Sequence, residues 1–325
     1  MRTPVSIIIC TRNRAEHLLQ TLASVGGIEV PEDLDPELLV VDNASVDGTV
    51  ELARTFPLNN MPLRVVQAPQ PGLSRARNVG IKEAKGEIFL FTDDDVRLPA
   101  NWLQAMTAPI RSGNADAVAG RVELAPHLQR PWMEDFHRAT LASTDYIKEE
   151  DPGVMMGASM VFHRRVLEKV PGFDPELGAG ALGTLEESLF SWQIVRAGFK
   201  IVTVSDAVVV HHCEVERLSR AAYISAAKKF GRCNLYLDYH WRYTLAKDWG
   251  QLTGRAPWVF LVKRSLRWFY WRVTRRQECQ GPEGISHWEF YLIINIYKIK
   301  QFLKERRRPR LYDEFGLAKR GGLLH

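Results

Sequence analysis

The stretch Phe91-Thr-Asp-Asp-Asp-Val96 ends an apolar run, Glu87–Thr92, with three consecutive carboxylates. The run has the length and composition of a buried strand. Adjacent carboxylates repel one another unless a cation or strong hydrogen-bond donors neutralise them. Mg²⁺ and Mn²⁺ bind carboxylate oxygens and take phosphate oxygens as further ligands. The stretch therefore predicts a strand that leads into a divalent-cation site for a diphosphate, the alternative being a solvated acidic turn.

Similar apolar runs alternate with helix-like stretches through the first half of the chain. This alternation predicts an α/β domain whose mostly parallel central sheet is flanked by helices on both faces. Gly86 is the expected C-cap of the third helix. The expected strands are Val5–Cys10, Glu37–Asp42, Leu63–Gln67 and Glu87–Thr92, and the expected helices are Glu16–Val25, a helix from Thr49 to Phe56, and Ser74–Ala84.

Polar clusters follow three of these strands. They are Thr11-Arg12-Asn13, Asp42-Asn43 and Asp93-Asp94-Asp95. Ligands of such sheets bind beyond the carboxyl ends of the strands. We therefore expect the three clusters to converge on one crevice.

The second half of the chain is less regular. Residues 178–185 are rich in Gly and Ala and predict a mobile loop, which leads into a helix ended by Gly198. Beyond about residue 217 the pattern is helical and aromatic. The further elements expected are strands at Ala117–Leu124, Met155–Phe162, Lys200–Val204 and Ala207–Val210, the last closing at His211-His212, and a helix at Glu186–Ala197.

Composition and charge exclude several classes of protein. The 325 residues are 46% hydrophobic, too apolar for a disordered chain, and the four cysteines show no CxxC spacing. Residues 251–325 hold 16 Lys and Arg against 6 Asp and Glu, a net charge of +10, whereas the remaining residues hold 27 against 32, a net −5. The overall charge of +5 is therefore a property of the C-terminal quarter, and we expect no nucleic-acid partner.

Membrane and export signals are absent from the sequence pattern. No window of 18 residues is both apolar and free of charge, so a transmembrane span is not expected. The run Val5–Cys10 is too short for the core of a signal peptide. We expect a cytoplasmic protein.

The segment Pro71-Gly-Leu-Ser-Arg-Ala-Arg-Asn-Val-Gly80 is a turn that leads into a helix. Ser74 is a candidate N-cap, and free N–H groups at a helix N-terminus suit an anion. Arg75 and Arg77 are candidates to face a phosphate. Asn78 is a candidate to bond a ribose or to stabilise the loop. A well-capped surface helix is the alternative.

Four sequence motifs, in this order along the chain, resemble those of a known family. They are Ser6-Ile-Ile-Ile-Cys-Thr-Arg-Asn13, Val40-Val-Asp-Asn-Ala-Ser-Val-Asp-Gly-Thr49, Ser74-Arg-Ala-Arg-Asn-Val-Gly80 and Phe91-Thr-Asp-Asp-Asp-Val96. Together they resemble the inverting family 2 glycosyltransferases, which have the GT-A fold and use nucleotide-activated sugars. The resemblance covers roughly residues 3–212. It implies a catalytic domain at 1–215, followed by a helical C-terminal region at 216–325.

The resemblance also implies roles for single residues at the nucleobase. It places the contacts to the nucleobase chiefly on Thr11, Arg12 and Asp42, with Asn13 a weaker candidate.

The phosphate side of the nucleotide follows from the same resemblance. Arg77 and Asn78 lie beside the nucleotide in such a site. Asp95 becomes the ligand of Mg²⁺ or Mn²⁺, and Asp93 or Asp94 lies on the ribose or next to the metal ligands.

A later motif of the family supplies the catalytic base. Aligning Arg196-Ala-Gly198 puts Glu187 where the family usually has an aspartate, with Glu186 before it. Glu187 would take the proton of the acceptor hydroxyl, although its side chain reaches about one methylene further. A solvated helix N-terminus is the alternative for this pair.

His211-His212 closes a strand and is a candidate for the metal or the diphosphate. Neutral imidazole is a common metal ligand. The sequence does not distinguish the two histidines, and His212 is the one we assign to the metal. Strand-end hydrogen bonding is the alternative.

The C-terminal quarter combines basic and aromatic residues. Trp258, Val262, Leu266, Phe269 and Val273 fall on one helical stripe, with basic residues mostly opposite. Such a helix suits an anionic membrane surface. The alternatives are a helical subdomain that packs its stripe on the catalytic core, and RNA binding.

These observations predict a metal-dependent inverting glycosyltransferase of hexosyltransferase type. Its expected partners are a nucleotide-sugar donor and a saccharide or lipid-linked saccharide acceptor, in cell-surface or exopolysaccharide glycan synthesis at the inner face of a membrane. The alternatives are a sugar nucleotidyltransferase and a non-catalytic nucleotide-sugar-binding module. The base, the sugar and the acceptor do not follow from the sequence.

Overall fold

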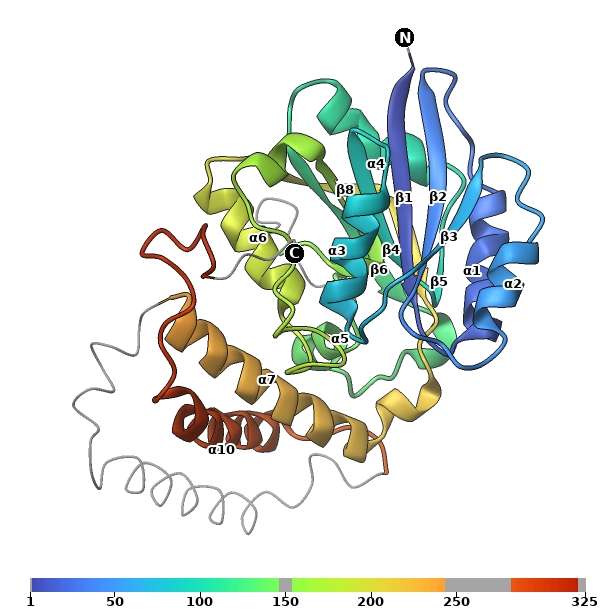
Figure 1. Cartoon of the computed structure of the whole chain (residues 1–325). Helices are drawn as coiled ribbons and strands as arrows, with labels where there is room; N and C mark the ends of the chain where they lie inside the picture. Colours follow the sequence, from blue (N-terminus) through green and yellow to red (C-terminus); the bar gives the residue numbers. More distant parts are fainter. Residues whose placement is uncertain (1, 146–153, 243–281, 321–325) are drawn as a thin grey trace.

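The computed structural model describes residues 2–145, 154–242 and 282–320. An eight-stranded sheet runs through these residues in the order β3-β2-β1-β4-β7-β6-β8-β5 (Figure 1). The strands are β1 (Thr3–Thr11), β2 (Leu34–Asp42), β3 (Leu63–Gln67), β4 (Ile88–Asp93), β5 (Val96–Arg97), β6 (Ala117–Leu124), β7 (Met160–His163) and β8 (Ile201–His211).

The predicted mostly parallel sheet is confirmed. β1 pairs in parallel with β2 and β4, β2 with β3, and β6 with β8. β7 runs antiparallel to both β4 and β6, and β5 runs antiparallel to β8. In this register Thr11 lies opposite Asp42, and Cys10 lies opposite Asp93. The ends of β1, β2 and β4 therefore meet at one edge.

Helices cover both faces of the sheet, because the apolar strands have no polar face. Leu18 and Leu22 of α1 pack in the same core cluster as Ile7 and Ile9 of β1. Ile8 points the other way and packs with Ile81 of α3 and with α6. The helices are α1 (Ala15–Gly26), α2 (Thr49–Thr55), α3 (Leu73–Glu83), α4 (Trp102–Arg111), α5 (Asp135–Thr140) and α6 (Glu186–Arg196).

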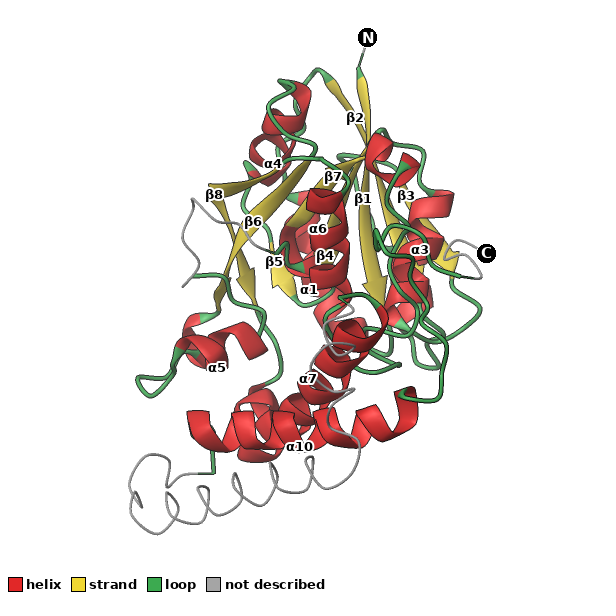
Figure 2. Ribbon diagram, turned by 90° about the vertical axis from the view of Figure 1, so that its left-hand side faces the viewer, coloured by secondary structure: helices red, strands yellow, loops and turns green. Residues whose placement is uncertain are grey.

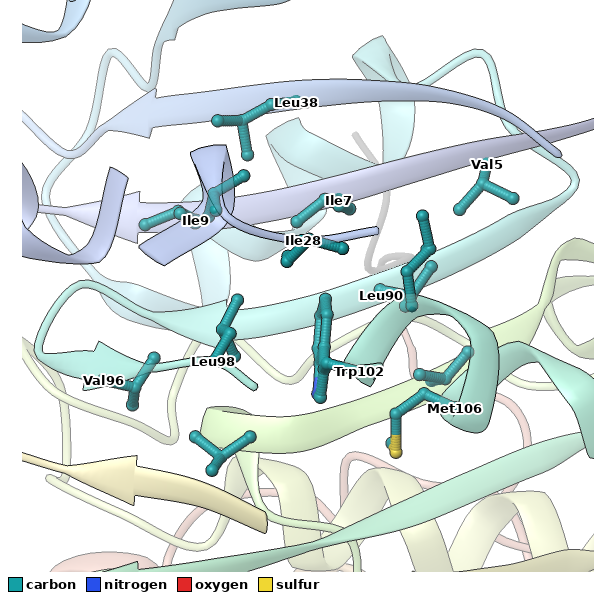
Figure 3. Close-up of a cluster of buried hydrophobic side chains, with 14 of the residues drawn as sticks. Val5, Ile7, Ile9, Ile28, Leu38, Leu90, Val96, Leu98, Trp102 and Met106 are labelled. Atoms are coloured by element: carbon teal, nitrogen blue, oxygen red, sulfur yellow. The ribbon is translucent and has the colours of Figure 1, made fainter. Parts of the chain in front are cut away.

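The core under α1 and α4 centres on Trp102, whose side chain is fully buried (Figure 3). Its indole N–H donates to Ser159 Oγ at 3.0 Å, so the one polar atom of the ring is satisfied. Leu90 and Met106 belong to the same cluster. This rigid layer holds β4, and therefore the acidic motif at its end, against β1.

Several local predictions are wrong. The third helix ends at Glu83 with Ala84 as its C-cap, and Gly86 instead lies beside β1, where an added Cβ would be 2.5 Å from the Ser6 nitrogen. Ser74 does not cap this helix, because its hydroxyl donates to the carbonyl of Leu177. The strand expected from Met155 begins at Met160, after a 3-10 helix at Gly157–Ser159.

Two further differences concern the second half of the domain. The two strands expected at 200–210 form the single strand β8. The helix α4 was not among the predicted elements, and it places Pro109 inside a helix.

Two long helices pack together below the sheet (Figures 1 and 2). They are α7 (Arg220–His240) and α10 (His287–Glu305). Gly231 of α7 lies so close to α10 that a Cβ there would be 2.5 Å from the carbonyl oxygen of Ile294. No helix in the described parts of the chain is long and apolar enough to cross a membrane. The amphipathic stripe expected at 258–276 lies outside the described residues.

The segment after α10 returns to the catalytic half. Tyr312 and Tyr236 donate their hydroxyls to Asp174 at 2.6 and 2.7 Å, and Lys319 forms an ion pair with the same buried carboxylate. Arg308 makes two hydrogen bonds of 2.9 Å to Glu176. Residues 306–320 thus hold the segment that precedes the predicted catalytic glutamates. The division at residues 215 and 216 stays a prediction.

Candidate active site

The edge where β1, β2 and β4 end gathers the predicted polar clusters. Thr11 donates its hydroxyl to Asp94 Oδ2 at 2.6 Å, although 83 positions separate the two residues. The backbone N–H of Asn43 donates to the carbonyl of Thr11 at 2.8 Å. The predicted convergence of the three strand ends is therefore a feature of the fold, as expected for parallel strands of one sheet.

Asp94 is buried within this edge. Besides the Thr11 hydroxyl, it accepts a hydrogen bond of 2.8 Å from Arg14 Nη1. Burial raises the pKa of Asp94 to about 7, against the opposing effect of Arg14, because the ionised form loses its hydration. Its main-chain carbonyl accepts from Thr21 of α1, which fixes the turn after β4.

Asp95 lies deeper, with its side chain 2% exposed. Its Oδ2 accepts from Arg14 Nη1 at 2.8 Å, and its Oδ1 lies 3.1 Å from His211 Nε2. Burial opposes ionisation, but His211 and Arg14 together hold the pKa of Asp95 well below its usual range. In the described residues Oδ1 has no hydrogen-bond donor that satisfies normal geometry. Asp95 is therefore a carboxylate with one oxygen available to a cation.

The histidine that reaches Asp95 is His211. Val96 pairs with His211 across β5 and β8, which brings the imidazole alongside Asp95. Its Nδ1 lies 2.8 Å from the carbonyl oxygen of Leu141 and so carries the proton of that hydrogen bond. His212 contacts Asp95 through its main-chain N–H, and its ring lies beside His127, with 5.7 Å between centroids. Since successive strand residues point to opposite sides, the geometry favours His211 over the predicted His212.

The predicted nucleobase residues surround the loop after β2. Asp42 is buried and accepts a hydrogen bond from the Ser45 N–H. Asn13, at φ 54°, accepts from the Val46 N–H at 2.8 Å and donates its own N–H to Ser45 Oγ. Arg12 is exposed. The structure thus gives Asn13 a role in holding this loop, while its contact with a nucleobase stays a prediction.

A buried guanidinium joins α3 to the predicted catalytic glutamates. Arg77, 2% exposed, donates from Nη1 to Glu186 at 2.9 Å and from Nη2 to Glu187 at 3.0 Å. Asp93 lies 3.7 Å from the same Nη2. Arg77 therefore connects the acidic motif with the glutamate pair instead of lying free for a phosphate.

The two glutamates have different surroundings. Glu186 is buried, and burial followed by the charge of Glu187 raises its pKa to about 8. Glu187 is partly exposed, and its Oε1 also accepts from the Gly157 N–H at 3.2 Å. The hydrogen bonds between the side chain of Glu187 and the rest of the described chain all reach Oε1. Oε2 of Glu187 therefore accepts no hydrogen bond from the described residues.

Asn78 has a structural partner. Its amide donates to the carbonyl of Phe173 and accepts from the Phe173 N–H, both at 2.8 Å. These two bonds attach α3 to the segment before the glutamates. A contact of Asn78 with the nucleotide remains a prediction.

The residues at Asp95 fit a divalent cation. The described parts of the chain hold no group of three or more His, Cys, Asp or Glu side chains placed for a metal. Mg²⁺ and related ions, however, are held in nucleotide sites by one or two side chains, with water and phosphate as the other ligands. Asp95 Oδ1 and His211 Nε2 supply such a pair, and the bond from His211 Nδ1 to a backbone carbonyl is typical of ligating histidines.

Sequence reasoning gave Arg14 no role, named Asn43 only as part of a polar cluster, and left His211 and His212 undistinguished before assigning His212 to the metal. Asn43 accepts a hydrogen bond of 3.0 Å from the Gly72 N–H, which ties the loop after β2 to the start of α3. Arg14 stands in the motif Thr11-Arg12-Asn13-Arg14, and the triple negative charge of the acidic motif was the signal for a buried cation.

Comparison with known proteins gives a consistent result. The model of the family described as glycosyl transferase family 2 matches residues 6–170. Glycosyltransferase AglE of Haloferax volcanii is 38% identical over 120 residues, which are 37% of this chain and 39% of AglE. Succinoglycan biosynthesis protein ExoM of Rhizobium meliloti is 33% identical over 138 residues, 41% of this chain and 44% of ExoM. The chain thus spans less than half the length of these curated relatives.

Two solved structures resemble the whole chain. A mannosyltransferase from Pyrobaculum calidifontis in complex with GDP-Man and Mn²⁺ is 20% identical, with a TM-score of 0.61 over 94% of this chain and 88% of that one. Residues 1–349 of S. aureus TarS in complex with UDP-GlcNAc are 17% identical, with a TM-score of 0.51 over 96% and 95%. At these identities the likeness concerns the fold.

Proposed function

The chain belongs to glycosyl transferase family 2, and from this premise we propose that it is a metal-dependent, inverting hexosyltransferase. It transfers a sugar from a nucleoside-diphosphate donor to a hydroxyl of a saccharide acceptor. The observation that carries the proposal is the Arg77 bridge, which sets Glu187 next to the acidic motif Asp93–Asp95. A base beside a diphosphate site is what a single displacement requires.

The nucleotide-sugar donor binds at the edge of the sheet where β1, β2 and β4 end. We assign the nucleobase to Thr11, Arg12 and Asp42, the ribose to Asp93 or Asp94, and the cation to Asp95 with His211. The mannosyltransferase of similar fold was solved with a nucleotide sugar and Mn²⁺, which supports Mn²⁺ or Mg²⁺ as the ion. When bound, the cation neutralises the charge that develops on the leaving diphosphate.

Glu187 accepts the proton of the acceptor hydroxyl. The bonds from Arg77 and Gly157 fix Oε1, so that Oε2 is presented to the acceptor. The acceptor oxygen attacks the anomeric carbon of the sugar. The bond between this carbon and the diphosphate oxygen breaks on the opposite face, so the configuration at the carbon inverts. Arg77 keeps the carboxylate oriented, and its fixed position compensates for the extra methylene of Glu relative to Asp.

The names of two relatives bear on the class of acceptor. ExoM bears the name of a polysaccharide biosynthesis protein, and TarS that of a poly(ribitol-phosphate) glycosyltransferase. We propose a cell-surface or exopolysaccharide glycan, or a lipid-linked precursor of one, as acceptor.

We also propose that the C-terminal region touches an anionic membrane surface on the cytoplasmic side. Exposed cations gather at the end of α10: Lys300, Lys304, Arg306 and Arg307. Clusters of this kind attract anionic lipid. Changing all four to Gln in the full chain should reduce its flotation with phosphatidylserine vesicles, whereas unchanged flotation would count against the membrane contact.

One experiment tests the enzymatic proposal. Nucleotide sugars with uracil, guanine and thymine bases are screened for binding with Mn²⁺, and the best binder is then assayed for release of nucleoside diphosphate with saccharide acceptors. Glu187→Gln should abolish release while binding persists, and Glu51→Gln, an exposed carboxylate on α2, serves as the control. Release of pyrophosphate from a nucleoside triphosphate would instead indicate a nucleotidyltransferase. Binding without any release would indicate a binding module.

A further inference from the structure

The guanidinium of Arg14 already lies as a cation against the acidic motif. Nη1 of Arg14 donates to Asp94 Oδ1 and to Asp95 Oδ2, both at 2.8 Å. One nitrogen of a guanidinium thus bridges the two carboxylates that the proposed function assigns to nucleotide and metal. A divalent cation held by Asp95 and His211 would carry its charge close to this guanidinium, and like charges repel one another.

The arrangement leaves part of Asp95 unsatisfied. Its Oδ1 is buried without a hydrogen-bond donor of normal geometry among the described residues, and it faces His211 Nε2 at 3.1 Å. Arg14 therefore neutralises one side of Asp95 and leaves the other to the imidazole. Because Nδ1–H of His211 donates a hydrogen bond to the Leu141 carbonyl, Nε2 faces this oxygen, and either a proton or a metal cation can lie between the two atoms.

Arg14 has a second ion-pair partner, Glu214, outside the acidic motif. Its other nitrogen, Nη2, is paired with Glu214, whose side chain is 40% exposed, and the Arg14 side chain is itself 25% exposed. The guanidinium can release Asp94 and Asp95 without losing its charge partner. A buried cation with no second partner would be far more costly to displace.

We propose that Arg14 is a built-in counterion, which occupies Asp94 and Asp95 in the ligand-free protein and is displaced toward Glu214 when a divalent cation binds. This inference rests on the metal use assigned under the proposed function. Arg14 thereby sets the affinity of the site for its cation: the ion must compete with a guanidinium, so it binds weakly until the diphosphate of the donor adds its own ligands.

The test measures Mn²⁺ binding directly, by electron paramagnetic resonance of free Mn²⁺, without nucleotide or acceptor. Arg14→Gln should bind Mn²⁺ about tenfold more tightly than the wild type, since two charge-assisted hydrogen bonds no longer compete. Arg14→Lys keeps the charge and should stay near the wild type. Arg217→Gln is the matched control, because Arg217 also acts electrostatically on Asp95 and His211 but donates its hydrogen bond to the Thr140 carbonyl.

The outcomes separate the possibilities. Tighter binding in Arg14→Gln with less than a threefold change in Arg217→Gln supports displacement. Equal effects in both variants, or weaker binding in Arg14→Gln, overturn it, and so does a failure of the wild type and the variant alike to bind Mn²⁺. A crystal structure of the wild type with Mn²⁺ gives an independent answer, since the ion bound with Arg14 still on Asp95 would also overturn the proposal. Transfer that persists in EDTA would contradict the metal use itself, and the two failures are thus distinguishable.

Discussion

Arg77 donates a hydrogen bond of 3.0 Å to Glu187, a residue 110 positions later in the chain. The same guanidinium bonds Glu186 at 2.9 Å and lies 3.7 Å from Asp93. Three carboxylates therefore share one buried cation, which links the sheet edge to α6. Because Asp93 and the adjacent pair Glu186-Glu187 belong to separate segments, this single side chain sets the position of the glutamates relative to the acidic motif.

Arg77→Met should destabilise the fold by about 3–5 kcal/mol, because it leaves carboxylates buried without their cation. Urea unfolding followed by circular dichroism measures the loss. At pH 7 the double variant Arg77→Met, Glu186→Gln should be more stable than Arg77→Met alone, since residue 186 then no longer has to take up a proton on folding. Additive effects in this cycle would contradict the coupling of the two residues.

Glu186 predicts a pH dependence of stability. Its pKa is raised from the usual 4.5 to about 8, so the folded protein holds a proton that the unfolded chain has lost between these values. Stability therefore falls as pH rises through this window, by at most about 1.4 kcal/mol per pH unit.

Glu186→Gln removes that titration. Its free energy of unfolding should match the wild type near pH 5 and exceed it increasingly toward pH 8. The comparison uses thermal unfolding at matched ionic strength, with Glu51→Gln as control. Parallel curves for wild type and Glu186→Gln would show that Glu186 is ionised throughout.

Asp95→Asn and Asp42→Asn should weaken nucleotide binding in different ways. Asp95→Asn should remove the Mn²⁺-dependent part of the nucleotide affinity. The loss should reach at least the roughly 10- to 100-fold that the loss of a group supporting a metal ligand costs. Asp42→Asn should weaken binding to a similar degree with Mn²⁺ and with EDTA, because Asp42 is assigned to the nucleobase. Calorimetric titration with UDP and GDP distinguishes the two. An Asp95→Asn protein that still responds to Mn²⁺ would remove Asp95 from the metal site.

Gly80 predicts a packing effect. A Cβ at this position of α3 would be 2.7 Å from Ile8 Cγ2 and 3.2 Å from Val41 Cγ2, so α3 would have to move off β1 and β2. Gly80→Ala should cost about 1–3 kcal/mol in urea unfolding. Gly48→Ala is the control, since nothing lies within 4 Å of its Cβ, and it should change stability by less than about 1 kcal/mol.

The strand ends were predictable from sequence because strand period and parallel pairing are local rules. Apolar runs of five or six residues that lead to Thr11, Asp42 and Asp93 determine which residues share an edge. The register places Asp42 opposite Thr11 and Asp93 opposite the preceding residue of β1. The sheet edge and its polar clusters required no knowledge of side-chain conformation.

The side-chain partners were not predictable in the same way. Arg77 was expected to face a phosphate, yet it bonds Glu186 and Glu187, because a carboxylate pair more than 100 positions away attracts the cation. The choice between His211 and His212 depends on where β8 ends relative to β5. Both questions depend on long-range packing, which charge pattern and spacing do not determine.

The late position of Tyr312 and Lys319, which contact Asp174, affects the order in which the chain folds during synthesis. Asp174 leaves the ribosome 138 residues before Tyr312 and 145 before Lys319, the groups that later bury and neutralise it. Until these residues emerge, the carboxylate remains hydrated, and the segment leading to Glu187 lacks the contacts that Tyr312 and Lys319 supply. The nascent chain can thus complete the sheet edge from β1 to β4 long before Glu187, the proposed base, is held in place.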